Sequence, residues 1–252
     1  MLKTRVIPCL LLKDSGLVKT IKFKDPKYIG DPMNAVKIFN EKEVDELIIL
    51  DISATIEKRK PSFEIINKIA SECFMPFGYG GGVRNIEDMK KIFKIGVEKV
   101  IINNYAIENP LFVKEASIQF GSQSIVVSID VKKNMSGEYE IFTHGGIEMT
   151  KLNLIEFVVK MEKMGAGELF LNAVDNDGTM QGYDIDLINK VSKAVNIPVI
   201  ACGGAGRIED FGKAIKAGAS AISAGSMFVF FGKLRAVLIN FPTQEELKEI
   251  LN

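Results

Sequence analysis

The sequence has no tryptophan, one histidine, three cysteines and no long run of hydrophobic residues. The wide spacing of Cys9, Cys73 and Cys202 indicates core packing in a reducing compartment, rather than disulfides or a metal site. His144 stands alone in a polar stretch, so we expect a solvated loop residue and predict neither a metal nor another cofactor. No run approaches the roughly 20 apolar residues that span a bilayer, and the N-terminus lacks the apolar region of a signal peptide. These absences predict a cytoplasmic protein.

Neither sign of charge is in excess, because 32 Lys and Arg balance 32 Asp and Glu. A neutral chain lacks the strong basic field that attracts nucleic acids or anionic membranes, so neither is expected as the main partner. The hydrophobic content of 47% and charged content of 25% are typical of a globular protein. A length of 252 residues suits one large domain, and the internal repeat described next favours a single domain over residues 1–252.

Two stretches of the chain, 76–104 and 198–226, repeat one pattern of strand, glycine-rich turn, helix and strand. Ile86-Glu87-Asp88 matches Ile208-Glu209-Asp210, a shift of 122 positions (208 − 86). This shift is close to half the length of the chain. The pattern therefore indicates that two halves arose by duplication.

Each copy places paired glycines directly after an apolar strand, where main-chain N–H groups can closely approach an anion. Two tight connections without a ligand are the alternative interpretation. A polar end to the following strand favours phosphate binding in both copies. The predicted phosphate-binding residues are Gly81, Gly82, Asn103 and Asn104 in the first copy, and Gly203, Gly204, Gly225 and Ser226 in the second.

Continuous rather than alternating apolar runs predict strands that are covered on both faces, as in a parallel sheet. The predicted strands are Arg5–Leu12, Glu46–Asp51, Pro76–Tyr79, Lys99–Ile102, Ile125–Asp130, Glu168–Asn172, Pro198–Cys202 and Ala219–Ala224. Helical patterns between them cover Pro32–Glu43, Pro61–Cys73, Ile86–Ile95, Pro110–Phe120, Leu152–Met164, Ile185–Val195 and Ile208–Ala217. Eight strand–helix units in about 250 residues predict an α/β fold, the (β/α)₈ TIM barrel, built from two duplicated half-barrels.

Functional residues of such a barrel gather where its strands end. Besides the glycine turns, the strand-end residues are Leu11, Asp51, Asp130, Asn172, Asp175 and Asp177. The two predicted anion sites face each other, which calls for a long substrate with a phosphate at each end. In the duplicated frame Leu11 stands opposite Asp130, and carboxylates at both positions could serve as acid and base, but leucine cannot transfer a proton.

The loop predicted after the first strand, Lys13–Gly30, carries five lysines, including Lys19. It could close over an anionic ligand, or it could be a solvated charged loop.

The motifs IPCL, KD, LDI, GYGGGV, FGSQSIVVSIDVK, GAGEL, DNDGT, ACGGAG and AGS occur in this order over nearly the whole chain. With these motifs the chain resembles the HisF family, the cyclase subunit of imidazole glycerol phosphate synthase. The resemblance implies a lyase that forms a heterodimer with a HisH-type glutaminase and uses its ammonia on the bisphosphate PRFAR. The products would be imidazole glycerol phosphate and the aminoimidazole carboxamide ribonucleotide. The family's phosphate contacts carry over to the eight glycine-turn residues given above, and Lys19 would belong to the substrate loop.

The resemblance also implies an ammonia gate of four alternating charges at the starts of strands, namely Arg5, Glu46, Lys99 and Glu168. Structural ion pairing alone would also explain such a group, because any single charge in a narrow barrel would be costly. Glu98, beside the gate, resembles an acidic residue that docks the glutaminase.

Leu11 departs from the family, which has a catalytic Asp there, while its partner Asp130 is present. This departure predicts a protein that binds substrate and delivers ammonia but cyclises poorly. The run LLLKDSGLVKTIKFKDPKYIGDP more closely resembles a HisF-like group associated with bacterial surface polysaccharide synthesis, in which ammonia passes to a separate sugar-aminating enzyme. The sister isomerase HisA is a third alternative, which the four charges and the FGSQSIVVSID segment disfavour.

Overall fold

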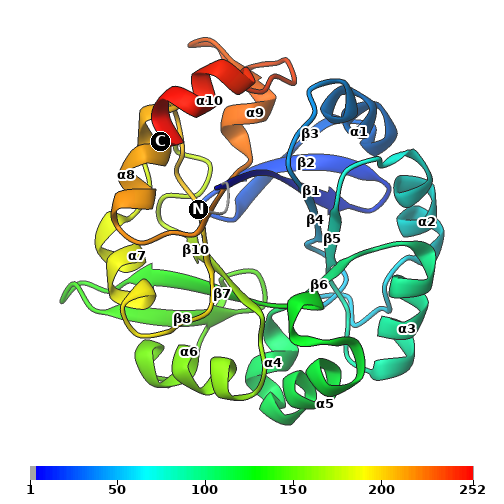
Figure 1. Cartoon of the computed structure of the whole chain (residues 1–252), viewed down its shortest axis with the longest axis vertical. Coiled ribbons are helices and arrows are strands. Elements are labelled where there is room, and N and C mark those ends of the chain that lie inside the picture. The colour runs from blue at the N-terminus through cyan, green and yellow to red at the C-terminus, as the bar shows by residue number, and fades with distance from the viewer. Residues whose placement is uncertain (1–3, 252) are drawn as a thin grey trace.

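A closed sheet of eight parallel strands forms the centre of the computed structural model, which describes residues 4–251 (Figure 1). Its strands are β1 (Arg5–Lys13), β4 (Leu47–Asp51), β5 (Phe77–Gly80), β6 (Lys99–Ile102), β7 (Ile125–Lys133), β10 (Glu168–Ala173), β11 (Val199–Cys202) and β12 (Ala221–Ala224). Pairing of β7 with β10 and of β1 with β12 closes the ring, so the barrel has no free edge. The predicted (β/α)₈ barrel is confirmed.

Helices surround the sheet as an outer ring (Figure 1). Those between barrel strands are α1 (Pro32–Glu41), α2 (Phe63–Glu72), α3 (Ile86–Ile95), α4 (Asn104–Glu108), α5 (Pro110–Phe120), α6 (Leu154–Lys163), α7 (Ile185–Ser192) and α8 (Glu209–Lys216), with a 3₁₀ turn at Ser122–Ser124. The helices α9 (Ser226–Val229) and α10 (Gln244–Leu251) follow β12, separated by the short strands β13 (Phe230–Phe231) and β14 (Ala236–Val237). The bounds of β6, α3 and α5 are those predicted, and the other predicted bounds differ by one to three residues.

Two hairpins were not predicted. The stretch expected to be one loop, Lys13–Gly30, forms the antiparallel strands β2 (Gly16–Ile21) and β3 (Lys24–Gly30). A second hairpin, β8 (Tyr139–Thr143) and β9 (Glu148–Met149), extends from β7. Most of β3 is polar and exposed and it contains Pro26, which an edge strand tolerates because one side of it needs no ladder hydrogen bonds. Because β3 has no alternating apolar pattern, its sequence predicted a loop.

Apolar side chains form two separate clusters, one between the sheet and the helices and one inside the barrel. Successive residues of a strand point to opposite faces, so Val6 and Leu10 of β1 join the outer cluster while Ile7 and Cys9 join the inner one. The inner cluster consists of Ile7, Cys9, Ile48, Ile101, Val126, Phe170, Ile200, Cys202 and Ala221, with Leu11 and Leu50 packed against it. The lumen of the barrel is therefore lined by apolar groups.

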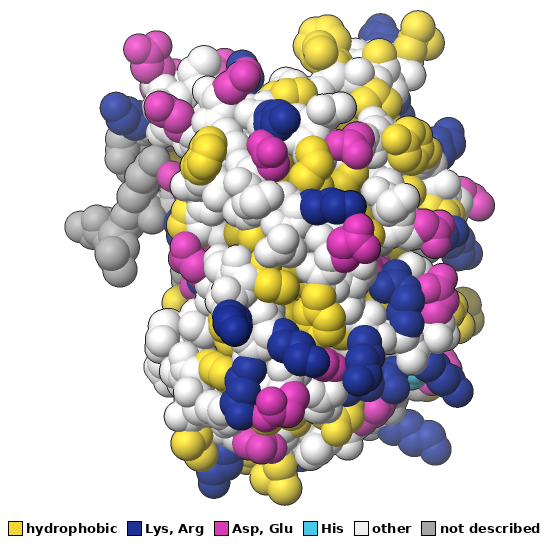
Figure 2. Space-filling model, turned by 90° about the vertical axis from the view of Figure 1, so that its right-hand side faces the viewer, with side chains coloured by type: hydrophobic (Ala, Val, Ile, Leu, Met, Phe, Trp, Pro, Cys, Tyr) yellow, Lys and Arg dark blue, Asp and Glu magenta, His cyan; other side chains and the backbone are white. Residues whose placement is uncertain are grey.

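The outer surface carries both signs of charge. Figure 2 shows Lys and Arg interspersed with Asp and Glu on the side that lies at the right of Figure 1, in keeping with the zero net charge. Within residues 4–251, no helix combines the length and the apolar character needed to cross a bilayer.

Candidate active site

A cavity of about 260 Å³ lies at the C-terminal ends of the barrel strands, where TIM barrels carry their active sites. It brings together predicted site residues from both halves of the chain. Those that line it are Lys19, Gly81, Gly82, Asn103, Asn104, Asp130 and Gly225.

The first glycine turn follows β5 and forms one wall of this cavity. Gly81 and Gly82 have φ of +127° and +71°, values that side chains rarely allow. A Cβ on Gly81 would lie 2.5 Å from the carbonyl oxygen of Asp51, and one on Gly82 would lie 2.7 Å from that of Arg59. Bare backbone at a concave wall is suited to an anion, and Arg84 beside it adds a positive charge.

Two asparagines stand next to this turn, at the start of α4. Asn103 donates from Nδ2 to Asp130 Oδ2 at 3.1 Å, and Asn104 Oδ1 accepts from the backbone N of His144 at 3.2 Å. Their other amide atoms, Asn103 Oδ1 and Asn104 Nδ2, are buried without a hydrogen-bond partner within residues 4–251, as is Asn172 Oδ1. Buried polar atoms are nearly always paired, so polar groups of a ligand in the cavity would satisfy them.

The second glycine turn, after β11, repeats the left-handed backbone of the first, with φ of +91° at Gly203 and +111° at Gly204. Gly225 lines the cavity, whereas in the described part of the chain Gly203, Gly204 and Ser226 lie outside its lining. A Cβ on Gly225 would meet Lys19 Nζ at 2.1 Å, so this lysine of the β2–β3 hairpin lies against the backbone of Gly225 at the cavity wall. The two predicted anion sites thus differ in their access to the cavity.

Lys19 is buried on β2 and donates from Nζ to the carbonyl oxygen of Cys9 at 2.6 Å. Its neighbours Lys22, Lys24 and Lys27 are exposed. Of these four lysines, Lys19 alone lines the cavity within the described residues, where its charge is available to an anionic ligand.

Asp130 is buried at the centre of the site, with a side chain that accepts from Asn103. Burial raises the pKa of its carboxyl to about 7, and the negative charge of Asp177 adds to this effect, while Asn103 and Lys132 oppose it. A carboxyl that titrates near neutral pH is suited to donate and accept protons.

Leu11 is half-buried on β1 and lines the same cavity. In the order of the barrel, β1 and β7 lie four strands apart in either direction, so Leu11 and Asp130 come from opposite walls. The wall facing Asp130 at this level therefore lacks an acid–base group on β1.

Asp51 and Asp177 also line the cavity, and the sequence had placed both at strand ends without distinguishing them from their neighbours. Asp51 is held as an ion pair by Arg59, whose Nη2 donates to Oδ1 at 2.7 Å. Asp177 accepts from Thr20 Oγ1 at 3.2 Å, and burial raises the pKa of its carboxyl. The contact with Thr20 could not be foreseen because the hairpin was not predicted.

All three cysteines are free thiols; Cys9 and Cys202 are buried, whereas Cys73 is half-buried. Cys9 and Cys202 meet inside the barrel, where a hydrogen bond from Cys202 and the nearby Lys19 lower the pKa of the Cys9 thiol. Within residues 4–251, no group of three or more His, Cys, Asp or Glu side chains is arranged to hold a metal. His144 is partly exposed in the β8–β9 turn, with Nδ1 3.3 Å from Glu148 Oε2.

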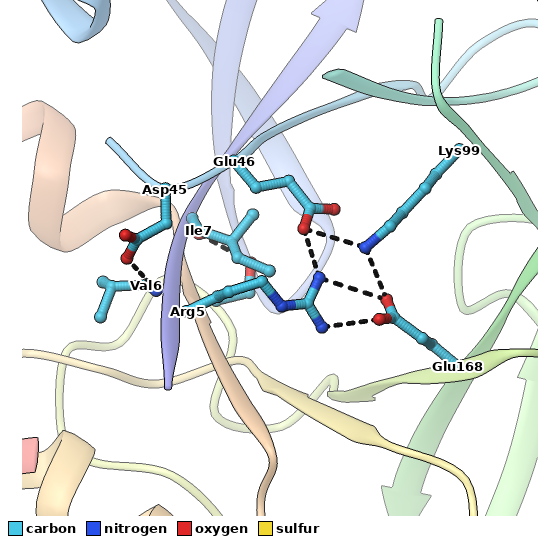
Figure 3. Close-up of polar contacts among 8 residues, drawn as sticks. Arg5, Val6, Ile7, Asp45, Glu46, Lys99 and Glu168 are labelled. Carbon is cyan, nitrogen blue, oxygen red and sulfur yellow. Dashed lines mark hydrogen bonds and ion pairs between the residues drawn. The ribbon is translucent and has the colours of Figure 1, made fainter. Parts of the chain in front are cut away.

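The four charges predicted to form a gate meet at the other end of the barrel (Figure 3). Arg5 donates to Glu46 and, through Nη2, to Glu168 at 2.6 Å, and Lys99 Nζ lies 3.0 Å from a carboxylate oxygen of each glutamate. Burial alone would lower the pKa of Arg5, but Glu168 and Glu46 raise it above its usual value. The ring is therefore closed, and it covers the end of the apolar lumen.

Glu98 directly precedes Lys99, the first residue of β6, and is exposed at the same end of the barrel. Phe74, which precedes β5, is 87% exposed there as well. Both lie on the barrel end that would face a partner docked over the ring.

Comparison with known proteins places these features in context. The family model described as "Histidine biosynthesis protein" matches residues 5–235. A protein of Pseudomonas aeruginosa named "Putative imidazole glycerol phosphate synthase subunit hisF2" is 50% identical over 98% of this chain and 99% of its own length. A "Putative imidazole glycerol phosphate synthase subunit HisF" of Leptospira interrogans is 46% identical over 100% and 99%. The "Imidazole glycerol phosphate synthase subunit HisF" of Alkaliphilus metalliredigens is 42% identical over 90% and 91%.

Proposed function

The chain belongs to the HisF family of histidine biosynthesis proteins, and on this premise we propose that it uses ammonia from a HisH-type glutaminase to cyclise the bisphosphate PRFAR. The glutaminase would dock on the barrel end that carries the charge ring. The reaction would take place in the cavity at the opposite end, with release of imidazole glycerol phosphate and the aminoimidazole carboxamide ribonucleotide.

The observation that carries this proposal is an apolar lumen with a charge ring at one end and an anion-suited cavity at the other. Uncharged ammonia can enter apolar surroundings, whereas an ion would lose its hydration at a high cost. Opening of the ring formed by Arg5, Glu46, Lys99 and Glu168 would admit ammonia, and the lumen would lead it towards Asp130.

Each part of the cavity has a task in this reaction. The backbone of Gly81–Gly82 and the amides of Asn103 and Asn104 would hold one phosphate, and the turn at Gly203–Gly204 with Gly225 and Ser226 would hold the other. Lys19 would turn from the Cys9 carbonyl towards the bound anion. Asp130, with a pKa of about 7, would exchange protons with the reacting groups at neutral pH.

A second candidate function follows from Leu11. With an aliphatic side chain on the wall opposite Asp130, the barrel could serve as an accessory subunit that passes ammonia to a sugar-aminating enzyme of surface polysaccharide synthesis. Two of the similar relatives are named only as a "putative" synthase subunit, which is in keeping with such a divergent role.

The two functions are separated by a cyclase assay on the purified chain without glutaminase, with PRFAR and a high concentration of ammonium at alkaline pH. We expect turnover, measured by release of the carboxamide ribonucleotide, because free ammonia replaces the partner's supply. The HisF protein of Alkaliphilus metalliredigens is the positive control. Binding of PRFAR without turnover would overturn the cyclase proposal and favour the accessory role.

A further inference from the structure

Asp177 places a carboxylate in the cavity, and the proposed reaction has so far given this carboxylate no role. It lies within the turn that follows β10, where its backbone N donates to the carbonyl oxygen of Ala173 at 3.0 Å. Its carboxylate lines the cavity and accepts hydrogen bonds from Thr20 Oγ1 and from the backbone N–H of Phe23. The β2–β3 hairpin thus holds this carboxylate at the mouth of the barrel.

The turn that carries Asp177 is adjacent to the strand that carries Asp130. Strands β10 and β7 pair in parallel with Asn172 beside Asp130, and the turn begins one residue later at Ala173. Both carboxyls line one cavity, and each resists ionisation because of burial and, for Asp130, because of the charge on Asp177. A negative charge on Asp177 favours the protonated form of Asp130, so one carboxyl of the cavity can hold a proton while the other is ionised.

The other candidates for a second acid–base group are engaged elsewhere. Asp51 is neutralised by Arg59, so its carboxylate is a poor proton carrier. Lys19 is bonded to the Cys9 carbonyl, the Cys9 thiol is hydrogen-bonded to Cys202, and Leu11 has no proton to give. Asp177 is the remaining cavity carboxyl within the described residues that has no ion pair.

We infer that Asp177 is the second acid–base group of this site and works with Asp130 in the role that Leu11 cannot fill. This inference rests on the proposed cyclisation. In each cycle one carboxyl gives its proton to the leaving group, while the other carboxylate takes a proton from the attacking nitrogen. The pair ends with one proton, as it began, so no further reactant is needed.

The test is the ammonium-driven assay on three variants of the full chain. Asp177→Asn keeps an oxygen for Thr20 but cannot exchange the proton, and kcat should fall by about 10²- to 10⁴-fold with a KM for PRFAR within about threefold. Addition of Leu11→Asp to the Asp177→Asn variant should raise kcat at least about tenfold above that of Asp177→Asn alone.

The matched control is Asp175→Asn. Asp175 lies in the same turn but is exposed, and its carboxylate accepts from the backbone N of Lys133. The kcat of this variant should be unchanged.

The pH profile of kcat separates an acid–base role from a positioning role. The titratable groups that face the pair are Lys19 on β2, Lys132 on β7, Cys9 on β1 and Cys202 on β11. In Asp177→Asn the limb near pH 7 should move to lower pH, because Asp130 no longer faces a like charge. An unmoved profile would overturn the inference.

The remaining outcomes are distinct. A wild-type level of kcat in Asp177→Asn, or a folded double variant without any recovery, would overturn the role of Asp177 and leave the proposed function standing. Absence of turnover in the wild-type protein would overturn the cyclase proposal together with this inference.

Discussion

Asp130 is a carboxyl that the fold keeps where its charge is poorly solvated. In the unfolded chain its pKa would be near the usual 3.8, whereas burial raises it to about 7 in the folded protein. Between these values the folded state holds a proton that the unfolded state has lost. Asp130 therefore makes the protein less stable as pH rises from about 4 to 7, and this cost is fully present above pH 7.

Asp130→Asn should remove that cost while keeping an oxygen for the hydrogen bond from Asn103. At pH 8 we expect the variant to be more stable than the wild type by on the order of 2–4 kcal/mol, and at pH 4 by much less. Urea denaturation at both pH values measures the difference, with the exposed Asp175→Asn as control. A variant that is less stable than the wild type at pH 8 would contradict the assignment of a raised pKa.

Among the elements, the glycine turn after β5 combines backbone strain with a wall of the cavity. Gly82→Ala would force a side chain into a left-handed backbone and place its Cβ 2.7 Å from the carbonyl oxygen of Arg59. We expect a loss of about 1–3 kcal/mol in the free energy of unfolding and at least a tenfold weaker affinity for PRFAR.

Gly96→Ala at the end of α3 is the matched control, because Gly96 is also left-handed, with φ of +111°, but has open space around it. Its cost in stability should be smaller, because the left-handed backbone is strained without a steric clash, and the affinity for PRFAR should not change. Urea denaturation and calorimetric titration with PRFAR measure the two effects. Equal losses of affinity in both variants would count against a phosphate site at the turn after β5.

The elements also show what the sequence could predict. The barrel strands were recognised because burial on both faces leaves continuous apolar runs, and the turns because glycine pairs follow those runs. The β2–β3 hairpin was missed because β3 has neither pattern, and with it the burial of Lys19 and the contact between Thr20 and Asp177. The resemblance predicted the four charged residues of the ring, but the sequence could not show that their side chains form a continuous set of ion pairs.

At the scale of the molecule, the two ends of the barrel should be functionally separable. Glu46→Gln weakens the ring, because both Arg5 and Lys99 lose a charged partner. In the complex with a HisH-type glutaminase, we expect the amount of product per glutamine hydrolysed to fall at least twofold. With free ammonium, kcat should stay within about threefold of wild type.

Glu87→Gln on the surface of α3 is the control, because its exposed ion pair with Lys90 contributes little. Glutaminase and cyclase rates measured together give the ratio. An unchanged ratio in Glu46→Gln would exclude the ring as the ammonia entrance.

The closed ring has a further consequence for how a partner is chosen. Two cations and two carboxylates lie within hydrogen-bond distance of one another, so their formal charges cancel and their combined field fades quickly with distance. An approaching protein would therefore interact first with exposed residues around the ring, such as Glu98 and Phe74, and only at short range with the ring itself. If the ring admits ammonia as proposed, partner recognition and ammonia entry would therefore depend on different residues, and the partner surface could change in evolution while the ring stayed the same.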